Sequence, residues 1–212
     1  MLKSLFFILF VKPLVLFIAG VHVKGRKNLP KKGPCIIAAN HNSHLDTLVL
    51  MSLFPSAMVS EVRPVAAADY FMKNWLVAWL SKALIGIIPL QRKPTKAEGH
   101  PLAEVHKALE AGEIVIIFPE GSRGEPEKLA PFKNGITHLV KAFTEVPVVP
   151  VCLYGAGKSL PKDEVLFVPF VIDVNIGVAL RYENEHDQTF AETLQKEVTK
   201  LQQSMHTCSP TI

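Results

Sequence analysis

The sequence predicts an α/β fold, with a mostly parallel central sheet flanked by helices and an N-terminal apolar helical segment that anchors the chain to a membrane. Short apolar runs alternate with amphipathic stretches along most of the 212 residues, which is typical of βαβ units around a parallel sheet. Hydrophobic residues make up 49% of the chain and charged residues 20%, a composition that excludes a disordered chain. The length favours one domain of ordinary size.

Residues 1–23 form the apolar segment, which we expect to associate with a membrane, and residues 24–212 form the folded domain. A spanning helix needs about 20 apolar residues, and this segment reaches that length only across Lys12 and Pro13. A lysine at the membrane centre costs roughly 2.5 to 3.5 kcal/mol. We therefore expect two short helices, broken at Lys12 and Pro13, that lie in the interface or enter one leaflet. A single span and a cleaved signal peptide are the alternatives.

Charge and tryptophan placement also suit a membrane surface. The formal net charge is +4, which favours anionic membranes or substrates. We expect no nucleic-acid partner, because basic residues are not interleaved with aromatic ones in a stripe. In the helix expected at 70–84, Trp75 and Trp79 share a face and Lys73 and Lys82 lie near the ends, a composition typical of an interfacial helix. An ordinary core helix is the alternative.

The other elements follow from local patterns. The apolar run 35–39 predicts a buried strand, and the β-branched run 114–118 predicts another. Gly112 ends the amphipathic helix expected before it. In order, we expect strands at 35–39, 62–67, 85–90, 114–118 and 146–154, with one or two more within 170–182, and helices at 46–53, 70–84, 95–111, 134–144 and 188–205.

The three cysteines are Cys35, Cys152 and Cys208. Their number is odd, and their spacing does not match a zinc motif. We expect reduced thiols, with Cys35 and Cys152 buried in strands.

His41 is the first candidate for catalysis. It follows the end of a predicted strand, where ligands bind in open α/β sheets. Asp46, five residues later, would lie about 140° away on a straight helix, so the two side chains meet only if His41 lies in the loop and Asp46 in the first helical turn. Asp46 would then fix the tautomer of His41 and leave its other ring nitrogen to take a proton from a substrate hydroxyl.

The same residues allow two other interpretations. Ser43 and Asp46 match a capping box, so Asp46 would only cap the helix. Alternatively, His41, His44 and Asp46 would bind a metal ion, although their spacing is not that of metallo-β-lactamase-like hydrolases and the sequence offers no second ligand cluster. From this segment alone, a catalytic base, a metal site and a structural loop all remain open.

The second candidate site is the segment 118–124, which follows the strongest predicted strand. Gly121 and Gly124 allow backbone N–H groups to approach an anion closely. Arg123 presents a planar fork that suits phosphate, and Glu120 would orient Arg123 or a substrate hydroxyl. The alternative is a glycine turn with a surface Glu–Arg pair.

Two weaker candidates lie nearby in the predicted fold. Arg92 and Lys93 follow the strand expected at 85–90, which places their charge at the same sheet edge or simply in solvent. Lys133 precedes a helix whose N-terminus would also attract an anion.

Together these segments resemble the lysophospholipid acyltransferase family, specifically the 1-acyl-sn-glycerol-3-phosphate acyltransferases, over about residues 30 to 160. An N-H-x-x-x-x-D pattern (the HX4D motif) is matched by Asn40, His41 and Asp46, and F-P-E-G-[ST]-R is matched by 118–123. An apolar strand around Pro150 matches a further block. The block ending at Arg92 departs most, because Pro89 and Gln91 replace the usual residues.

The resemblance implies a reaction and its site. His41, held in place by Asp46, would deprotonate the sn-2 hydroxyl of 1-acylglycerol 3-phosphate (lysophosphatidic acid). The hydroxyl oxygen would attack the thioester of acyl-CoA or acyl carrier protein and give phosphatidic acid for phospholipid biosynthesis. The acceptor would be bound by Arg92, Glu120, Gly121, Ser122, Arg123 and Lys133. No cofactor or metal is implied.

We further expect membrane association at the cytoplasmic face of the inner (cell) membrane. The alternative acceptors are another lysophospholipid, glycerol 3-phosphate and a lipidated amine. The alternative functions are a metal-dependent hydrolase and a lipid-binding protein.

Overall fold

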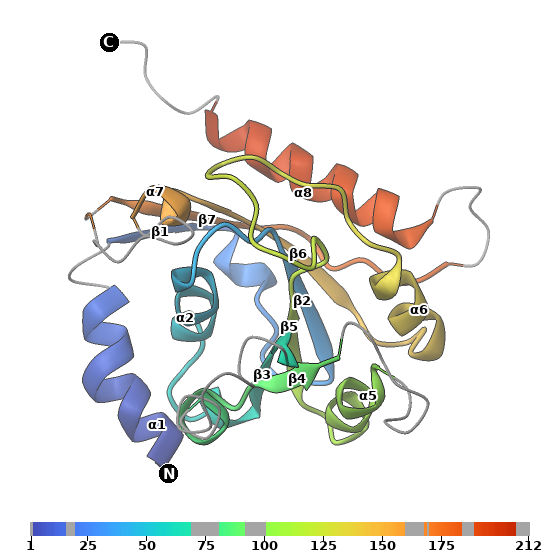
Figure 1. Cartoon of the computed structure of the whole chain (residues 1–212), viewed down its shortest axis with the longest axis horizontal. Helices are drawn as coiled ribbons and strands as arrows, with labels where there is room; N and C mark the ends of the chain where they lie inside the picture. Colours follow the sequence, from blue (N-terminus) through green and yellow to red (C-terminus); the bar gives the residue numbers. More distant parts are fainter. Residues whose placement is uncertain are drawn as a thin grey trace.

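The computed structural model describes residues 2–15, 20–68, 81–91, 101–159, 168, 170–183 and 189–206. Its elements are, in chain order, α1 (Leu2–Phe6), η1 (Phe7–Val11), β1 (Val21–Lys24), η3 (Arg26–Asn28), β2 (Cys35–Ala39), α2 (Leu45–Ser52), η4 (Val59–Glu61), β3 (Val62–Ala67), η5 (Ser81–Ile85), β4 (Ile88–Leu90), α5 (Ala103–Glu110), β5 (Ile114–Ile117), α6 (Gly135–Ala142), β6 (Val148–Tyr154), α7 (Ala156–Ser159), β7 (Ile172–Ile176) and α8 (Phe190–His206) (Figure 1). The elements labelled η are short 3₁₀ or π turns. Arg92, Lys93, Cys208 and residues 69–80, which carry both tryptophans, lie outside the described residues.

The described strands form one sheet in the order β1-β7-β6-β2-β5-β3-β4. From β6 to β4 all neighbours are parallel, whereas β7 is antiparallel to β6 and β1 is parallel to β7. The mostly parallel sheet predicted from the sequence is therefore confirmed. Because these strands are parallel, β2, β5 and β6 end at the same edge of the sheet, which we call the carboxyl edge.

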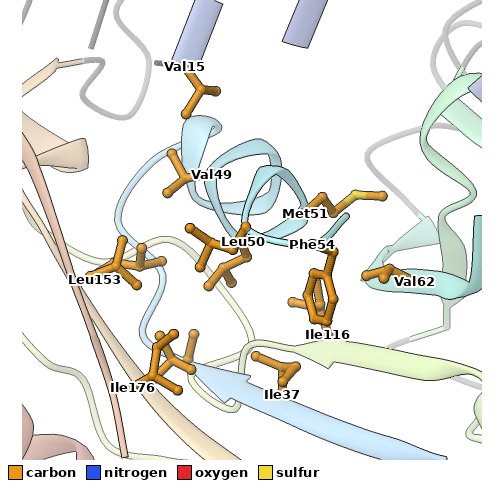
Figure 2. Close-up of a cluster of buried hydrophobic side chains, with 14 of the residues drawn as sticks. Val15, Ile37, Val49, Leu50, Met51, Phe54, Val62, Ile116, Leu153 and Ile176 are labelled. Carbon is orange, nitrogen blue, oxygen red and sulfur yellow. The ribbon is translucent and has the colours of Figure 1, made fainter. Parts of the chain in front are cut away.

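Helices cover both faces of the sheet and bury two apolar layers (Figure 1). On one face, α2 and the N-terminal helical turns pack over Ile37 and Ile116 (Figure 2). On the other face, α5, α6 and α8 pack over Ile36 and Val115. Alternate residues of β2 and β5 point to opposite faces, and both faces are covered, so these strands read as unbroken apolar runs. This explains why they were easy to locate in the sequence.

The N-terminal segment packs against the domain along one side. Phe7, Val11 and Val15 recur every four residues and are at most 2% exposed, and Figure 2 shows Val15 facing Val49 of α2. The opposite side of the segment carries large apolar residues that are 39% to 63% exposed, namely Leu5, Ile8, Leu9, Phe10 and Leu14. We call these five residues the outer apolar face.

The expected break at Lys12 and Pro13 is wrong. Helical geometry continues from Leu2 to Val15. The backbone N–H of Lys12 bonds to the carbonyl of Phe7, five residues back, in a π turn. Proline clashes with the carbonyl four residues before it in a regular α-helix, and a widened π turn is one way for a helix to accommodate such a disturbance. Within the described residues, none of the helices has both the length and the apolar character needed to cross a membrane.

Other differences from the sequence predictions occur at the margins of the sheet. Strand β1 was missed, because its four residues continue the apolar N-terminal segment and it is an edge strand with alternating exposure. The strand expected at 85–90 is shorter, since Ser81–Ile85 winds into a π turn before β4. The predicted bounds 35–39 and 62–67 agree with β2 and β3.

Candidate active site

His41 and Asp46 meet at the carboxyl edge. His41 lies in the loop after β2, and Asp46 lies in the first turn of α2. The Nδ1 atom of His41 is 2.9 Å from Oδ2 of Asp46. A carboxylate only accepts hydrogen bonds, so Nδ1 carries the proton and Nε2 is the basic nitrogen. This is the arrangement that the sequence required if the two side chains were to work together.

The same oxygen of Asp46 also holds the loop that precedes α2. Oδ2 accepts the backbone N–H groups of Asn42, at 2.7 Å, and Ser43, at 2.8 Å. Asp46 is fully buried, and these donors, together with the positive end of α2, stabilise its negative charge. The N-cap residue His44 makes no side-chain capping bond, so of the predicted capping box the structure shows the bond from the Ser43 N–H to Asp46. The same oxygen of Asp46 both holds this loop and orients His41.

The segment 118–124 surrounds His41. The His41 ring stacks on Phe118, with ring centroids 4.1 Å apart and planes 18° apart. The N–H of His41 donates to Oε1 of Glu120 at 2.9 Å, and its carbonyl accepts the N–H of Gly124 at 2.9 Å. The ring and both backbone groups of His41 are thus held by one loop.

Strand register explains why two loops 79 residues apart meet in this way. In the parallel pairing of β2 with β5, Ala38 lies opposite Ile117. His41 and Glu120 each follow three residues later, so they leave the sheet at the same level. Asn40 fixes the other side of the loop, because its side chain bonds to both the N–H and the carbonyl of Leu153 beyond the β2–β6 ladder, at 2.7 and 2.9 Å.

Glu120 is a buried carboxylate within this arrangement. It is 3% exposed, and its Oε2 accepts the N–H of Ala130 at 3.3 Å. Burial raises the pKa of Glu120 to about 7, and the nearby Asp46 charge adds to the rise, although the two backbone donors oppose it. Both carboxylate oxygens thus accept backbone N–H groups within the protein, and the expected contact of Glu120 with a substrate hydroxyl stays a prediction.

Cationic side chains lie on the outer side of the loop. Nη1 of Arg123 contacts Nε2 of His44. Gly121 has φ of 74°, and a Cβ atom at this position would lie 2.7 Å from Nζ of Lys133, so the bare backbone lets the lysine approach the turn. Gly121, Ser122, Arg123 and Lys133 form the part of the predicted anion cradle that the structure describes.

The metal interpretation finds no ligand set in the described part of the chain. The described residues contain no group of three His, Cys, Asp or Glu side chains that is placed to hold a metal ion. Nε2 of His44 contacts the guanidinium of Arg123. Cys35 and Cys152 are buried free thiols, and burial raises the pKa of each to about 12.

Two residues near the site had no signal in the sequence. Asn42 is 3% exposed, and its Nδ2 donates to the carbonyl of Glu125 at 3.2 Å. Glu127 has φ of 62°, the left-handed region that non-glycine residues rarely adopt. Its Oε1 accepts the N–H of Gly155 at 2.9 Å. In each case the side chain bonds to one backbone group of another segment. No spacing pattern in the sequence reveals such a contact.

Comparison with known proteins agrees with this geometry. Residues 20–154 match the sequence model of the family described as Acyltransferase. The chain belongs to the acyltransferase family. The family resemblance seen in the sequence is therefore confirmed, and the segment that matches this acyltransferase family ends with β6.

Individual relatives carry more specific names. The acyltransferase chain is 33% identical over 140 residues to the chloroplastic 1-acyl-sn-glycerol-3-phosphate acyltransferase BAT2 of Brassica napus, a match that covers 66% of this chain and 38% of the relative. It is 30% identical over 196 residues to the 1-acyl-sn-glycerol-3-phosphate acyltransferase of Pseudomonas aeruginosa, with 91% of this chain and 72% of that protein covered. The chain thus spans well under half of the plant relative.

A solved structure shares the fold. The crystal structure of the 1-acyl-sn-glycerophosphate (LPA) acyltransferase PlsC from Thermotoga maritima superposes with a TM-score of 0.76 at 21% sequence identity, covering 98% of this chain and 81% of that one. At this identity the likeness establishes the fold of the acyltransferase and leaves its substrate to other arguments.

Proposed function

We propose that this chain transfers a fatty acyl group from an acyl thioester to the sn-2 hydroxyl of 1-acylglycerol 3-phosphate, giving phosphatidic acid. The observation that carries the proposal is the 2.9 Å contact between His41 Nδ1 and Asp46 Oδ2 at the carboxyl edge, beside the Gly121–Gly124 turn. The names of the Brassica and Pseudomonas relatives support the choice of acceptor.

The proposed reaction needs only one base. Nε2 of His41 takes the proton of the acceptor hydroxyl as its oxygen attacks the thioester carbonyl. Asp46 stabilises the imidazolium that forms, and the imidazolium returns the proton to the departing thiolate. The acyl–oxygen bond forms and the acyl–sulfur bond breaks, without a covalent enzyme intermediate. The side chain of His41 is 21% exposed, which leaves room for a substrate to reach it.

Arg123 and Lys133 are the proposed partners of the acceptor phosphate, with the backbone of Gly121 and Ser122 completing the cradle. Guanidinium and ammonium groups beside a glycine turn suit a phosphate. Arg92 is a further proposed partner, because it follows β4 by two residues and β4 runs parallel to β3 toward the same edge.

We also propose that the protein binds a membrane through the outer apolar face of its N-terminal segment, at the cytoplasmic face of the cell membrane. The acceptor is a lipid, and the exposed residues of this face form a continuous apolar side on a helix that is packed against the domain. Acyl-CoA and acyl carrier protein are both retained as donors, because each presents the same thioester.

The test is an assay of membrane fractions with lysophosphatidic acid and either acyl-CoA or acyl carrier protein. His41→Ala should abolish transfer while the protein stays folded, whereas His138→Ala, an exposed histidine on α6, should keep it. Near-normal turnover of His41→Ala would reject the mechanism. Preferred transfer to glycerol 3-phosphate, another lysophospholipid or a lipidated amine would change the acceptor. Loss of activity with a chelator would favour the hydrolase, and lipid binding without thioester-dependent product would favour a lipid-binding protein.

A further inference from the structure

The side chain of Glu120 is directed into the protein rather than toward a substrate. It is 3% exposed, Oε1 accepts the N–H of His41 at 2.9 Å, and Oε2 accepts the N–H of Ala130 at 3.3 Å. One carboxylate therefore joins the loop that carries the proposed base to the far end of the loop that carries the anion cradle.

The bond from His41 to Glu120 is one of several contacts that hold His41 against the segment 118–124. Because Gly124 bonds to the His41 carbonyl and Phe118 stacks on its ring, the position of His41 depends on this loop at three points. Asp46 sets the rotation of the ring, but its described hydrogen bonds go to the His41 ring and to the backbones of Asn42 and Ser43 rather than to the His41 backbone. Of the side chains described here, Glu120 is the one bonded to the His41 main chain.

We infer that Glu120 is a positioning residue, which holds the backbone of His41 so that the imidazole stays in line with Asp46 and the acceptor hydroxyl, and that it does not itself bind the acceptor. The inference rests on the proposed function for its kinetic consequence, but the hydrogen bond that carries it does not. A carboxylate suits this task, because its two oxygens accept hydrogen bonds and both partners are N–H donors.

The test uses Glu120→Gln, which keeps the shape of the side chain. Whichever way the amide is turned, its NH₂ group faces a backbone N–H, so one of the two contacts becomes a repulsion. Glu120→Asp keeps the charge but shortens the side chain by one carbon–carbon bond, about 1.5 Å. The matched control is Glu125→Gln, because Glu125 lies in the same loop with its side chain 72% exposed and paired only with Lys128 among the recorded contacts.

Two measurements separate positioning from acceptor binding. We expect kcat to fall by about 10²-fold in both Glu120 variants, the cost of a roughly 1 Å misplacement, with KM for lysophosphatidic acid unchanged. We also expect faster amide hydrogen exchange at His41, read by NMR without substrate. The control should match the wild type in both measurements.

The inference is overturned if KM rises while kcat is kept, since Glu120 would then bind the acceptor, or if neither kcat nor the exchange rate changes. Should the wild type show no transfer at all, the proposed function fails, and the exchange rate at His41 still decides whether Glu120 holds its backbone. If Glu120→Gln does not fold, Glu120→Asp decides the question by the same two readouts.

Discussion

Replacing Asp46 with asparagine tests how the site holds its base. Three N–H groups converge on Oδ2, from the ring of His41 and from the backbones of Asn42 and Ser43. In Asp46→Asn the amide oxygen must occupy this position, because the NH₂ group would face three donors there. His41 therefore keeps its tautomer in the variant, and what disappears is the negative charge opposite the imidazolium.

The size of the effect follows from this geometry. A hydrogen bond to a charged group contributes about 1.5–3 kcal/mol and a neutral one about 0.5–1.5 kcal/mol, so the lower bound of the loss is about 1 kcal/mol. The attraction between unit charges about 4 Å apart, near 4 kcal/mol at an effective dielectric constant of about 20, sets the upper bound. We expect kcat to fall by about 5- to 1,000-fold, less than the roughly 10⁴-fold that a wrong tautomer costs.

The assay is kcat at saturating substrates, with ¹⁵N NMR of the imidazole to identify the tautomer. Asp173→Asn is the matched control, because Asp173 also lies 3.0 Å from a histidine Nδ1, that of His22, but at an exposed position on β7. A loss of 10⁴-fold or a changed tautomer would show that the amide turns. An unchanged kcat would show that Asp46 only caps the helix.

Three further predictions concern stability and membrane binding. Because the pKa of Glu120 rises from 4.5 to about 7 on folding, the folded chain binds this proton more tightly than the unfolded chain does. The contribution of Glu120 to stability is therefore fully present below pH 4.5 and is lost as the pH rises through about 7, by up to about 3 kcal/mol at about 1.4 kcal/mol per pKa unit. Urea unfolding between pH 4.5 and 8 should show this fall in the free energy of unfolding in the wild type and not in Glu120→Gln. If the free energy of unfolding changes equally with pH in both proteins, the prediction is wrong. Gly121→Ala should cost about 1–2 kcal/mol, because φ is 74°, and it should raise KM for the acceptor as its methyl group displaces Lys133; an unchanged melting temperature would count against the strain. Phe10→Ser, at a residue 63% exposed, should weaken sedimentation with anionic vesicles without changing the melting temperature. Val178→Ser, at a residue 73% exposed outside the outer apolar face, should leave sedimentation with the vesicles unchanged. If both variants bind the vesicles equally well, the outer apolar face does not bind the membrane.

The sequence allowed the buried strands to be predicted but not the edges of the sheet. β2 and β5 are covered on both sides, so their composition alone identifies them. β1 pairs only with β7 and exposes alternate residues, a weak pattern that merges with the apolar segment before it. The helix through Pro13 was missed because proline rules describe α-helices, and a π turn escapes them.

The site was predictable in its side chains and not in its backbone. His41 and Asp46 were found because a histidine after a strand and an acid in the next helical turn have a recognisable spacing. Nothing in the spacing showed that Glu120 would bond to the His41 N–H, because that contact depends on the register of β2 with β5. The register is set by the packing of both strands over the whole sheet, and local patterns do not contain it.

Two buried carboxyl groups stand at the same edge, and backbone N–H groups bond to both. Asp46 is fully buried and Glu120 is 3% exposed, and a buried charge without compensation is strongly destabilising. Each accepts two backbone N–H groups from the loops at this edge, and Asp46 also accepts the ring N–H of His41. Main-chain donors do not ionise, so they hold both carboxyl groups without cationic side chains, although burial outweighs them at Glu120 and raises its pKa to about 7. Arg123, which contacts His44, and Lys133 lie on the outer side of the loop, where we propose that an anionic acceptor binds. The carboxyl edge of a parallel sheet thus suits the proposed chemistry, because it supplies backbone donors that hold His41 and Asp46 in place.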